Sequence, residues 1–491
     1  MIKKMLRSTV GWPAGIRRIE DAEHSGAEYR TEHDSIGERK VPADAYYGVQ
    51  TLRAAENFMI TGLSTHPELI NHLVLIKKAA AITNARTGHL DQKIADAITA
   101  ACDEILRGGF REHFVVDPVQ GGAGTSLNMN ANEVIANRAI ELLGGQKGDY
   151  SLVHPNDHVN MSQSTNDVIP TAGRMAAVHL LMNLRLQLRC LQIALSNKAA
   201  EFDHVVKMGR TQMQDAVPIR MGQEFRAYAD AIERCEARID AVTGELRHVN
   251  MGGTAIGTAV NADEDYLRMI VPVINEVSGM EFIQADDLID STQNLDPFVA
   301  VSGAVKACAV AMSKIANDLR LMSSGPQAGF GEIHLPSMQN GSSIMPGKVN
   351  PVIPEVVNQV AFNVIGNDVT ITMAAEAGQL ELNAFEPIIF YNLFQSIDTL
   401  GSAAETFADN CISGIEADEE RCLSQVENSV MVATALAPVL GYEKAADIAK
   451  EALEYGRSVR DIVKEKGLMD DEELDRVLDP YSMTEATCTK N

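Results

Sequence analysis

The segment GSSIMPGKVN, residues 341–350, gathers in one short loop several residue types that can stabilise negative charge. Ser342 and Ser343 supply hydroxyl groups and adjacent main-chain N–H groups, Lys348 supplies a cation, and Asn350 supplies an amide. Hydroxyl, amide and ammonium groups are well suited to binding carboxylates. A donor-rich loop also suits a substrate on which charge develops during reaction. The loop therefore predicts chemistry on a carboxylate-bearing substrate.

Three other polar blocks interrupt the helical pattern of the chain, at residues 121–130, 154–167 and 209–215. Each contains hydroxyl or amide side chains, which can donate hydrogen bonds to a carboxylate. The same residue types cap helices, so capping alone is the alternative explanation for any one block. Neither the phosphate-binding pattern GxxxxGK[ST] nor the zinc-binding pattern HExxH occurs in the sequence. The candidate binding residues in these blocks are Thr125, Ser164, Thr165, Asn166, Thr211 and Gln212.

Long helical stretches must position these blocks. Apolar residues between 175 and 195 are spaced by threes and fours, which is the period of an α-helix. Similar helix-favouring stretches cover residues 217–249, 297–322, 352–379 and 387–413. Helices of this length exceed the average of about 11–12 residues and need partners along their whole length. We therefore predict an all-α fold built around a bundle of long helices.

One of these stretches, FVAVSGAVKACAVAM at residues 298–312, is apolar around much of a helix's circumference. A surface helix is apolar on one face only, so this helix needs cover on several sides. The few long helices of a single chain are not enough to cover one another fully. We therefore predict that the bundle is shared between the subunits of a homo-oligomer.

The overall charge and the cysteines exclude several classes of protein. The chain has 42 Lys and Arg against 67 Asp and Glu, a formal charge of −25, so we expect no nucleic-acid partner. It has no run of 18 apolar residues, so we expect no membrane span. Its seven cysteines, an odd number without a CxxC pair, predict reduced thiols in a cytoplasmic protein.

The polar blocks and the change in helix length divide the chain into four predicted regions. Residues 1–30 are basic at their start and broken by Pro13, which predicts a disordered N-terminal extension. Residues 31–165 form an N-terminal domain and residues 166–420 form the long-helix bundle. Shorter helical patterns in residues 421–491 predict a small C-terminal helical domain.

The loop GSSIMPGKVN resembles the signature of the fumarase/aspartase superfamily. The resemblance runs from about Glu38 to the C-terminus and includes VPADAYYGVQTLRA (41–54), GGAGTSLNMNANEVIANRA (121–139), NMSQSTNDVIPTA (160–172) and GRTQMQDAVP (209–218). It implies a lyase that breaks a bond β to a carboxylate without an organic cofactor. It also implies the three-domain superfamily fold, in which a homotetramer shares the central bundle and builds each active site from three subunits.

Two features make the chain similar to the aspartases within that superfamily. The stretch PVIPEVVNQVAFNVIGND (351–368) is similar to aspartases and unlike the corresponding fumarase stretch. Gln212 occupies a position where fumarases and some aspartases have a histidine with a proton-transfer or water-positioning role. A glutamine cannot act as an acid or base near neutral pH, but it can hydrogen-bond an ammonium group. The resemblance thus implies reversible deamination of L-aspartate to fumarate and ammonia.

The resemblance further assigns roles to the candidate residues. Ser342 is the base that removes the Cβ proton, which produces a doubly charged aci-carboxylate. The other residues bind three parts of the substrate: the β-carboxylate by Thr125, Ser164, Thr165 and Ser343, the α-carboxylate by Lys348 and Asn350, and the amino group by Asn166, Thr211 and Gln212.

Several alternatives stay open at this point. Arg39 and Arg53 match family arginines whose roles are structural or catalytic. His154 and His158 invite a metal site, but turn histidines with satisfied hydrogen bonds are the favoured explanation, and in fumarases the matching block contributes to a second carboxylate site. Some aspartases respond to divalent cations, although the sequence shows no ligand set.

Three other functions compete with aspartate deamination. A fumarate hydratase would share the fold and the loop, and a lyase for N-substituted aspartates, such as argininosuccinate, would need a larger pocket. A non-catalytic structural homologue, like those that became lens crystallins, is the third. The intact Ser342, Lys348 and Asn350 argue against that last alternative.

Overall fold

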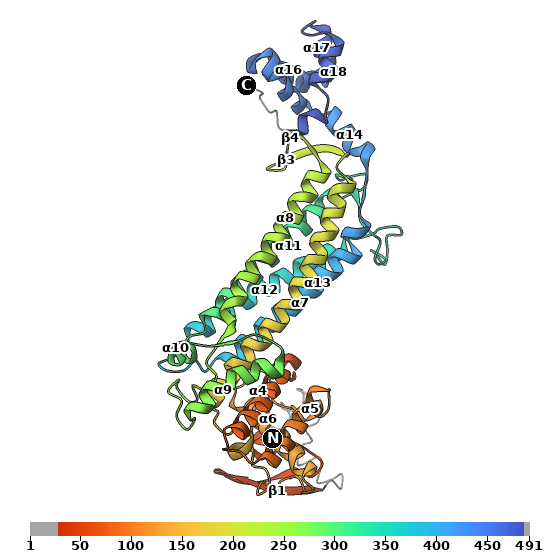
Figure 1. The fold of residues 1–491 in the computed structure, drawn as a ribbon. Helices are drawn as coiled ribbons and strands as arrows, with labels where there is room; N and C mark the ends of the chain where they lie inside the picture. Colours follow the sequence, from red (N-terminus) through yellow and green to blue (C-terminus); the bar gives the residue numbers. More distant parts are fainter. Residues whose placement is uncertain (1–27, 486–491) are drawn as a thin grey trace. The chain divides into compact units, whose positions relative to one another are not determined.

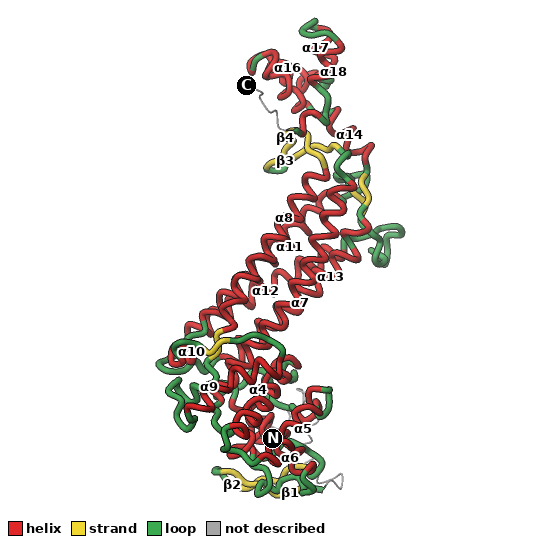
Figure 2. Tube along the Cα trace, viewed as in Figure 1, coloured by secondary structure: helices red, strands yellow, loops and turns green. Residues whose placement is uncertain are grey.

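The computed structural model of the chain describes residues 28–485. Helices predominate in this part of the chain, and its strands pair only into four two-stranded sheets (Figure 2), so the predicted all-α class is confirmed. Most of the predicted N-terminal extension, residues 1–27, lies outside the described residues. The chain forms two compact units, unit 1 (residues 1–184, 238–306 and 363–398) and unit 2 (residues 185–237, 307–362 and 399–491).

Unit 1 contains the helices that follow the N-terminal hairpin (Figure 1). Helix α4 contacts α5 and α9, and its inward side chains, including Leu73 and Ile76, are fully buried. The elements wholly within unit 1 are the antiparallel pair β1 (Tyr29–Asp34) and β2 (Gly37–Pro42), the parallel pair β5 (His248–Val249) and β6 (Ile283–Gln284), and helices α3 (Val49–Asn57), α4 (Pro67–Arg86), α5 (Gln92–Leu106), α6 (Thr125–Leu142), α9 (Glu264–Ser278) and α10 (Leu288–Gln293).

Unit 2 contains the C-terminal helices, which surround an apolar core of their own. Val426, Leu436, Ile462 and Leu474 are fully buried in that core, and Met208 contributes to it from strand β3. The elements wholly within unit 2 are the antiparallel pairs β3 (Val206–Thr211) with β4 (Gln214–Arg220) and β7 (Ile333–His334) with β8 (Glu416–Ala417), and helices α14 (Glu419–Glu427), α15 (Ala437–Leu440), α16 (Tyr442–Tyr455), α17 (Val459–Glu465) and α18 (Asp471–Val477).

Five long helices each contribute to both units: α7 (Thr165–Glu201), α8 (Met221–Thr243), α11 (Asp296–Met322), α12 (Val352–Glu376) and α13 (Glu386–Asn410). Polar contacts join neighbouring helices within each unit. In unit 1, Asp368 of α12 accepts hydrogen bonds from Ser302 and Lys306 of α11. In unit 2, Tyr228 of α8 donates to Asp318 of α11. The predicted set of long helices is therefore present.

The burial of helix α11 explains why its sequence is so apolar. Its buried residues recur at spacings of three and four, as in Phe298, Val301, Val305, Cys308 and Met312, so one stripe of the helix is core. Among the described residues, this helix alone is long and apolar enough to cross a membrane. An apolar segment within it has a mean hydropathy of 1.5, and half of that segment is buried. A mostly buried core helix meets the same criterion.

The hairpin β3–β4 corrects one prediction. We expected a helix from residue 217, but strand β4 extends to Arg220 and α8 begins only at Met221. The hairpin turn consists of Gln212 and Met213, both with positive φ (52° and 63°), and neither is a residue type that announces such a turn. The predicted domain boundaries near residues 165 and 420 stay predictions.

Candidate active site

The loop at residues 341–350 closes on itself within unit 2. The main-chain N–H of Gly341 donates to the oxygen of Lys348 over 3.0 Å, and Asn350 Nδ2 donates to the oxygen of Gly341 over 2.6 Å. A Cβ atom on Gly341 would lie 2.3 Å from the Lys348 oxygen, so only glycine permits this approach. Asn350 therefore holds the two ends of the loop together, in addition to its predicted binding role.

Ser342 lies inside this closed loop, with main-chain donors aimed at its hydroxyl. Its Oγ accepts hydrogen bonds from the N–H groups of Ile344, over 3.2 Å, and Met345, over 2.9 Å. Donors in this arrangement stabilise a serine oxyanion, because they are already oriented before charge appears. The local geometry thus suits Ser342 to act as a base, while Ser343 is exposed beside it.

A cavity of about 1140 Å³ adjoins the loop in unit 2. Lys348 and Asn350 line it, which places both predicted α-carboxylate residues on one surface. Three other titratable side chains, Arg320, His334 and Glu355, line the same cavity and are not among the predicted site residues. Glu355 lies within the PVIPEV motif, and an acidic residue in the first turn of the helix after the loop was the available signal.

Thr125 occupies the first position of helix α6 in unit 1. Gly122 and Gly124 precede it with φ of 86°, and Thr125 Oγ1 donates to the Gly122 oxygen over 2.8 Å. A Cβ on Gly124 would lie 2.9 Å from a methyl carbon of Ile169, so this turn packs directly against the first turns of α7. The N-terminus of α6 therefore lies beside α7, and Thr125 is exposed at this N-terminus.

Ser164, Thr165 and Asn166 form the N-terminus of helix α7, also in unit 1. Ser164 caps the helix, because its Oγ accepts from the N–H of Asn166 over 3.2 Å while its own N–H donates to Asp167 over 2.9 Å. Thr165 Oγ1 accepts from Asn128 Nδ2 of α6 over 3.2 Å. The capping explanation thus holds for Ser164. Helix N-termini also favour anions, so capping and carboxylate binding are compatible here.

A buried lysine donates hydrogen bonds to the polar segment that directly precedes α7. Lys77 of α4 is fully buried and donates to Asn160 Oδ1 over 2.7 Å and to Gln163 Oε1 over 2.9 Å. Burial lowers its pKa to about 7, and burial likewise raises the pKa of Asp167 to about 6. A buried cation held by neutral amides is costly, so such groups concentrate at functional sites. No sequence pattern marked Lys77, because it lies in an otherwise ordinary helix.

Thr211 and Gln212 lie at the exposed tip of the β3–β4 hairpin in unit 2. Ion pairs fix strand β3 of this hairpin: Arg210 lies 2.7 Å and Lys207 3.1 Å from the two carboxylate oxygens of the buried Glu332. Glu332 directly precedes strand β7, from which the chain continues to the loop. The same carboxylate therefore anchors the hairpin and the start of the loop segment.

The candidate residues thus fall into groups at three places in one chain. Unit 1 holds Thr125, Ser164, Thr165 and Asn166, whose Nδ2 donates to the Ala255 oxygen over 2.7 Å. In unit 2, Thr211 and Gln212 lie at the hairpin tip, and Ser342, Ser343, Lys348 and Asn350 lie in the loop.

Four other residues considered from the sequence have local partners. Arg39 pairs with Glu56 over 3.3 Å and Arg53 with Asp34 over 2.8 Å, which indicates structural roles. His154 Nδ1 accepts main-chain N–H groups of residues 156 and 157, and His158 Nδ1 accepts the N–H of His154. These hydrogen bonds agree with the favoured explanation of satisfied turn histidines, which stays a prediction.

Comparison with known proteins agrees with the geometry. Residues 37–366 match the Lyase family and residues 432–485 match the Fumarase C C-terminus family. An aspartate ammonia-lyase of Bacillus subtilis (strain 168) is 54% identical over 93% of this chain and 96% of its own length. A solved fumarate lyase:delta crystallin from Brucella melitensis bound to cobalt superposes with a TM-score of 0.91 at 52% identity, covering 94% of this chain and all of that one.

A more distant solved structure, a class II fumarase from Schistosoma mansoni, has a TM-score of 0.90 at 34% identity and covers 93% of this chain and 99% of its own. The fold is therefore common to ammonia-lyases and fumarases, while sequence identity is much higher to the ammonia-lyases. With its loop, its helix N-terminal hydroxyls and Gln212 in place, the chain belongs to the aspartate ammonia-lyase family of the fumarase/aspartase superfamily.

Proposed function

We propose that the protein catalyses the reversible deamination of L-aspartate to fumarate and ammonia. The observation that carries this proposal is the identity of 50–54% to aspartate ammonia-lyases of Bacillus subtilis and Escherichia coli over at least 91% of the chain. The donor arrangement around Ser342 supplies the matching chemistry within the chain itself.

In the proposed mechanism Ser342 removes a proton from Cβ of aspartate. The N–H groups of Ile344 and Met345 stabilise its oxyanion before the transfer, and the electron pair left on Cβ delocalises into the β-carboxylate. The C–N bond then breaks, ammonia leaves, and a C=C bond forms. Ammonia is a better leaving group than hydroxide, so this step needs no acid in place of Gln212.

Different hydroxyl and amide groups bind different parts of the substrate. The aci-carboxylate carries an extra negative charge, so hydrogen bonds from Thr125, Ser164, Thr165 and Ser343 strengthen as the reaction proceeds, each contributing about 2.7–4 kcal/mol. The α-carboxylate binds on the cavity wall that carries Lys348 and Asn350. The leaving amino group is assigned to Asn166, Thr211 and Gln212.

We further propose that the active protein is a homotetramer in which three subunits build each active site. Support comes from α12, where Ile365, Val369 and Met373 follow one another at spacings of four and are 37%, 56% and 66% exposed in the single chain. An apolar stripe of this kind needs cover from a partner. The candidate residues also fall into three groups, at the N-termini of α6 and α7, at the hairpin tip and in the loop, which a shared site would unite.

Two further assignments complete the proposal. A cytoplasmic location accords with the six cysteines among the described residues, which are thiols and of which five are buried. Binding of a divalent cation, without an organic cofactor, draws support from the solved relative of Brucella melitensis that is bound to cobalt.

Fumarate formation from L-aspartate and from L-malate separates the candidate functions. We expect steady formation from aspartate and at least a hundredfold slower formation, on the order of the discrimination a polar site achieves, from malate. Activity on malate alone would make the protein a hydratase. No activity on either substrate would leave the structural homologue, and activity only on N-substituted aspartates would identify the third alternative.

A further inference from the structure

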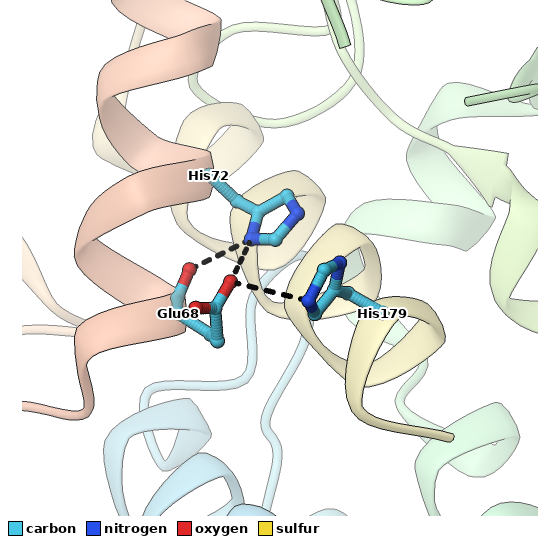
Figure 3. A group of neighbouring side chains, drawn as sticks. All are labelled: Glu68, His72 and His179. Atoms are coloured by element: carbon cyan, nitrogen blue, oxygen red, sulfur yellow. Dashed lines mark hydrogen bonds and ion pairs between the residues drawn. The ribbon is translucent and has the colours of Figure 1, made fainter. Parts of the chain in front are cut away.

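A cluster of two imidazoles and one carboxylate lies in unit 1 (Figure 3). Glu68 and His72 stand four residues apart on α4, which places them on the same face of the helix. His179 reaches the cluster from α7, and one ligand atom from each residue lies within 4.8 Å of the other two. Among residues 28–485, no other group of His, Cys, Asp or Glu brings three such atoms together.

The carboxylate of Glu68 lies between the two rings. Its Oε2 is 3.7 Å from Nδ1 of His72 and 3.9 Å from Nε2 of His179, and the ring centroids are 5.5 Å apart. These separations are too long for direct hydrogen bonds. They leave a space between the three atoms that a small cation fills after a slight convergence of the ligands, since metal–ligand distances are about 2.0–2.2 Å.

The three residues differ in burial, so one ligand is held rigidly while the other two are accessible to an incoming ion. His72 is 3% exposed and fixed on α4, whereas the side chains of Glu68 and His179 are 26% and 46% exposed and free to adjust.

Asn71 and Arg111 orient the carboxylate of Glu68. Asn71 Nδ2 donates to Glu68 Oε1 over 3.1 Å, and Arg111 donates in turn to Asn71 Oδ1. These hydrogen bonds hold Oε1 of Glu68 and leave its Oε2 directed at the imidazoles. Partners of this kind fix the ligands of established metal sites.

We propose that Glu68, His72 and His179 bind a divalent transition-metal ion. Two imidazole nitrogens and one carboxylate oxygen form a ligand set that Zn²⁺, Co²⁺ and Ni²⁺ prefer, with water in the remaining positions. Mg²⁺ and Ca²⁺ favour oxygen ligands and are poorly served here. His72 Nδ1 now donates to the main-chain oxygen of Glu68 over 2.7 Å, so metal binding at Nδ1 breaks this hydrogen bond and moves the proton of the neutral ring to Nε2.

The bound ion would join α4 to α7 within unit 1. Further along α4, Lys77 donates to Asn160 and Gln163, and α7 begins at Thr165, directly after its cap Ser164. The ion thus fixes α4 against α7, whose N-terminus carries the hydroxyls of Ser164 and Thr165, and no atom of the cluster belongs to the reacting groups.

Calorimetric titration of the tag-free protein with Co²⁺ tests the site, together with the visible absorption of bound Co²⁺. We expect one ion per chain, and displacement of that ion by Zn²⁺ but not by excess Mg²⁺. His179→Ala should weaken the affinity at least about tenfold, because it removes one of the three ligands and even the loss of a residue that only orients a ligand costs that much.

The controls separate this site from adventitious binding and from the proposed activity. His204→Ala removes an exposed histidine of unit 2 and should leave Co²⁺ affinity unchanged. Glu68→Gln serves as a second variant if His179→Ala does not fold, as judged by circular dichroism. Equal affinity in the folded variants and the wild type, or no Co²⁺ binding by the wild type, would overturn the site. Because the readout is binding, neither result depends on turnover of aspartate.

Discussion

At the residue scale, the amide of Gln212 stands where an acid or base would be needed if water were the leaving group. It occupies the first position of a two-residue turn and is exposed in the single chain, so it is free to bind substrate rather than the rest of the hairpin. Its side chain can accept a hydrogen bond from an ammonium group but cannot transfer a proton near neutral pH.

We therefore expect Gln212→Ala to lower kcat/KM for aspartate about 10- to 100-fold, since a hydrogen bond to a charged group is worth about 1.5–3 kcal/mol. Steady-state kinetics of fumarate formation measure this change. Gln214→Ala, at the other end of the same turn, is the matched control and should retain nearly full activity. Equal losses in the two variants would indicate damage to the hairpin instead of a lost substrate contact.

Lys77 makes a prediction about stability. Its pKa is lowered from 10.5 to about 7 in the folded chain, because burial disfavours the charged form. Between these pH values the unfolded chain holds a proton that the folded chain lacks, so the free energy of unfolding rises with pH through this window. Lys77→Met removes that rise. Urea unfolding of both proteins from pH 7 to pH 10 should therefore show a stability difference that changes with pH.

The neighbouring Lys78 provides the control for this measurement. It pairs with Asp103 over 2.6 Å at a partly exposed position, so Lys78→Met should follow the pH profile of the wild type. Parallel profiles for the wild type and Lys77→Met would mean that Lys77 stays charged in the folded protein throughout this range.

At the scale of elements, the loop depends on the close approach of Gly341 to Lys348. A methyl group on Gly341 would lie 2.3 Å from the Lys348 oxygen and 2.8 Å from the Asn350 nitrogen, so the loop must open. Since misplacement of a catalytic group by about 1 Å can cost a hundredfold in rate, Gly341→Ala should lose at least about that much of kcat. Circular dichroism should be unchanged. Gly244→Ala, where an added methyl meets nothing within 4 Å, should remain fully active.

The long helices were predictable because their apolar spacing is regular. The predicted stretch 297–322 corresponds to α11, and 352–379 corresponds to α12 with an end three residues earlier. The β3–β4 hairpin was missed, because its turn uses Gln212 and Met213 and no glycine or asparagine marks it. Periodicity reports which face of a helix is buried, but short strands held by distant ion pairs, such as Arg210 with Glu332, leave no local pattern.

The candidate site, like the fold, was predictable only in part. Ser342, Lys348 and Asn350 were found because they stand together in one loop, and the hydroxyls at the start of α7 were found as a polar block. Lys77, Arg320 and Glu355 were missed, because their relevance comes from burial or from a cavity wall that only the folded chain defines.

At the scale of the whole molecule, the distribution of candidate residues predicts complementation between defective subunits. If the loop and the hairpin in one active site come from different subunits, a hybrid of Ser342→Ala and Gln212→Ala chains contains some sites with neither change. Refolding the two variants together should then yield more activity than either variant refolded alone. Mixing them without unfolding is the control. Hybrid activity equal to the average of the parents would place both residues in one subunit's site.

The assignment of Ser342 as the base that removes the Cβ proton is the central claim, and its direct test is proton exchange and turnover in Ser342→Ala beside Ser343→Ala. Loss of a positioned base lowers rates by about 10²–10⁴-fold. We predict that Ser342→Ala loses at least this much of kcat and no longer exchanges the Cβ proton of aspartate with deuterium from solvent. Ser343→Ala should still exchange it, with weaker stabilisation of the intermediate. Undiminished Cβ exchange in folded Ser342→Ala protein would contradict the account.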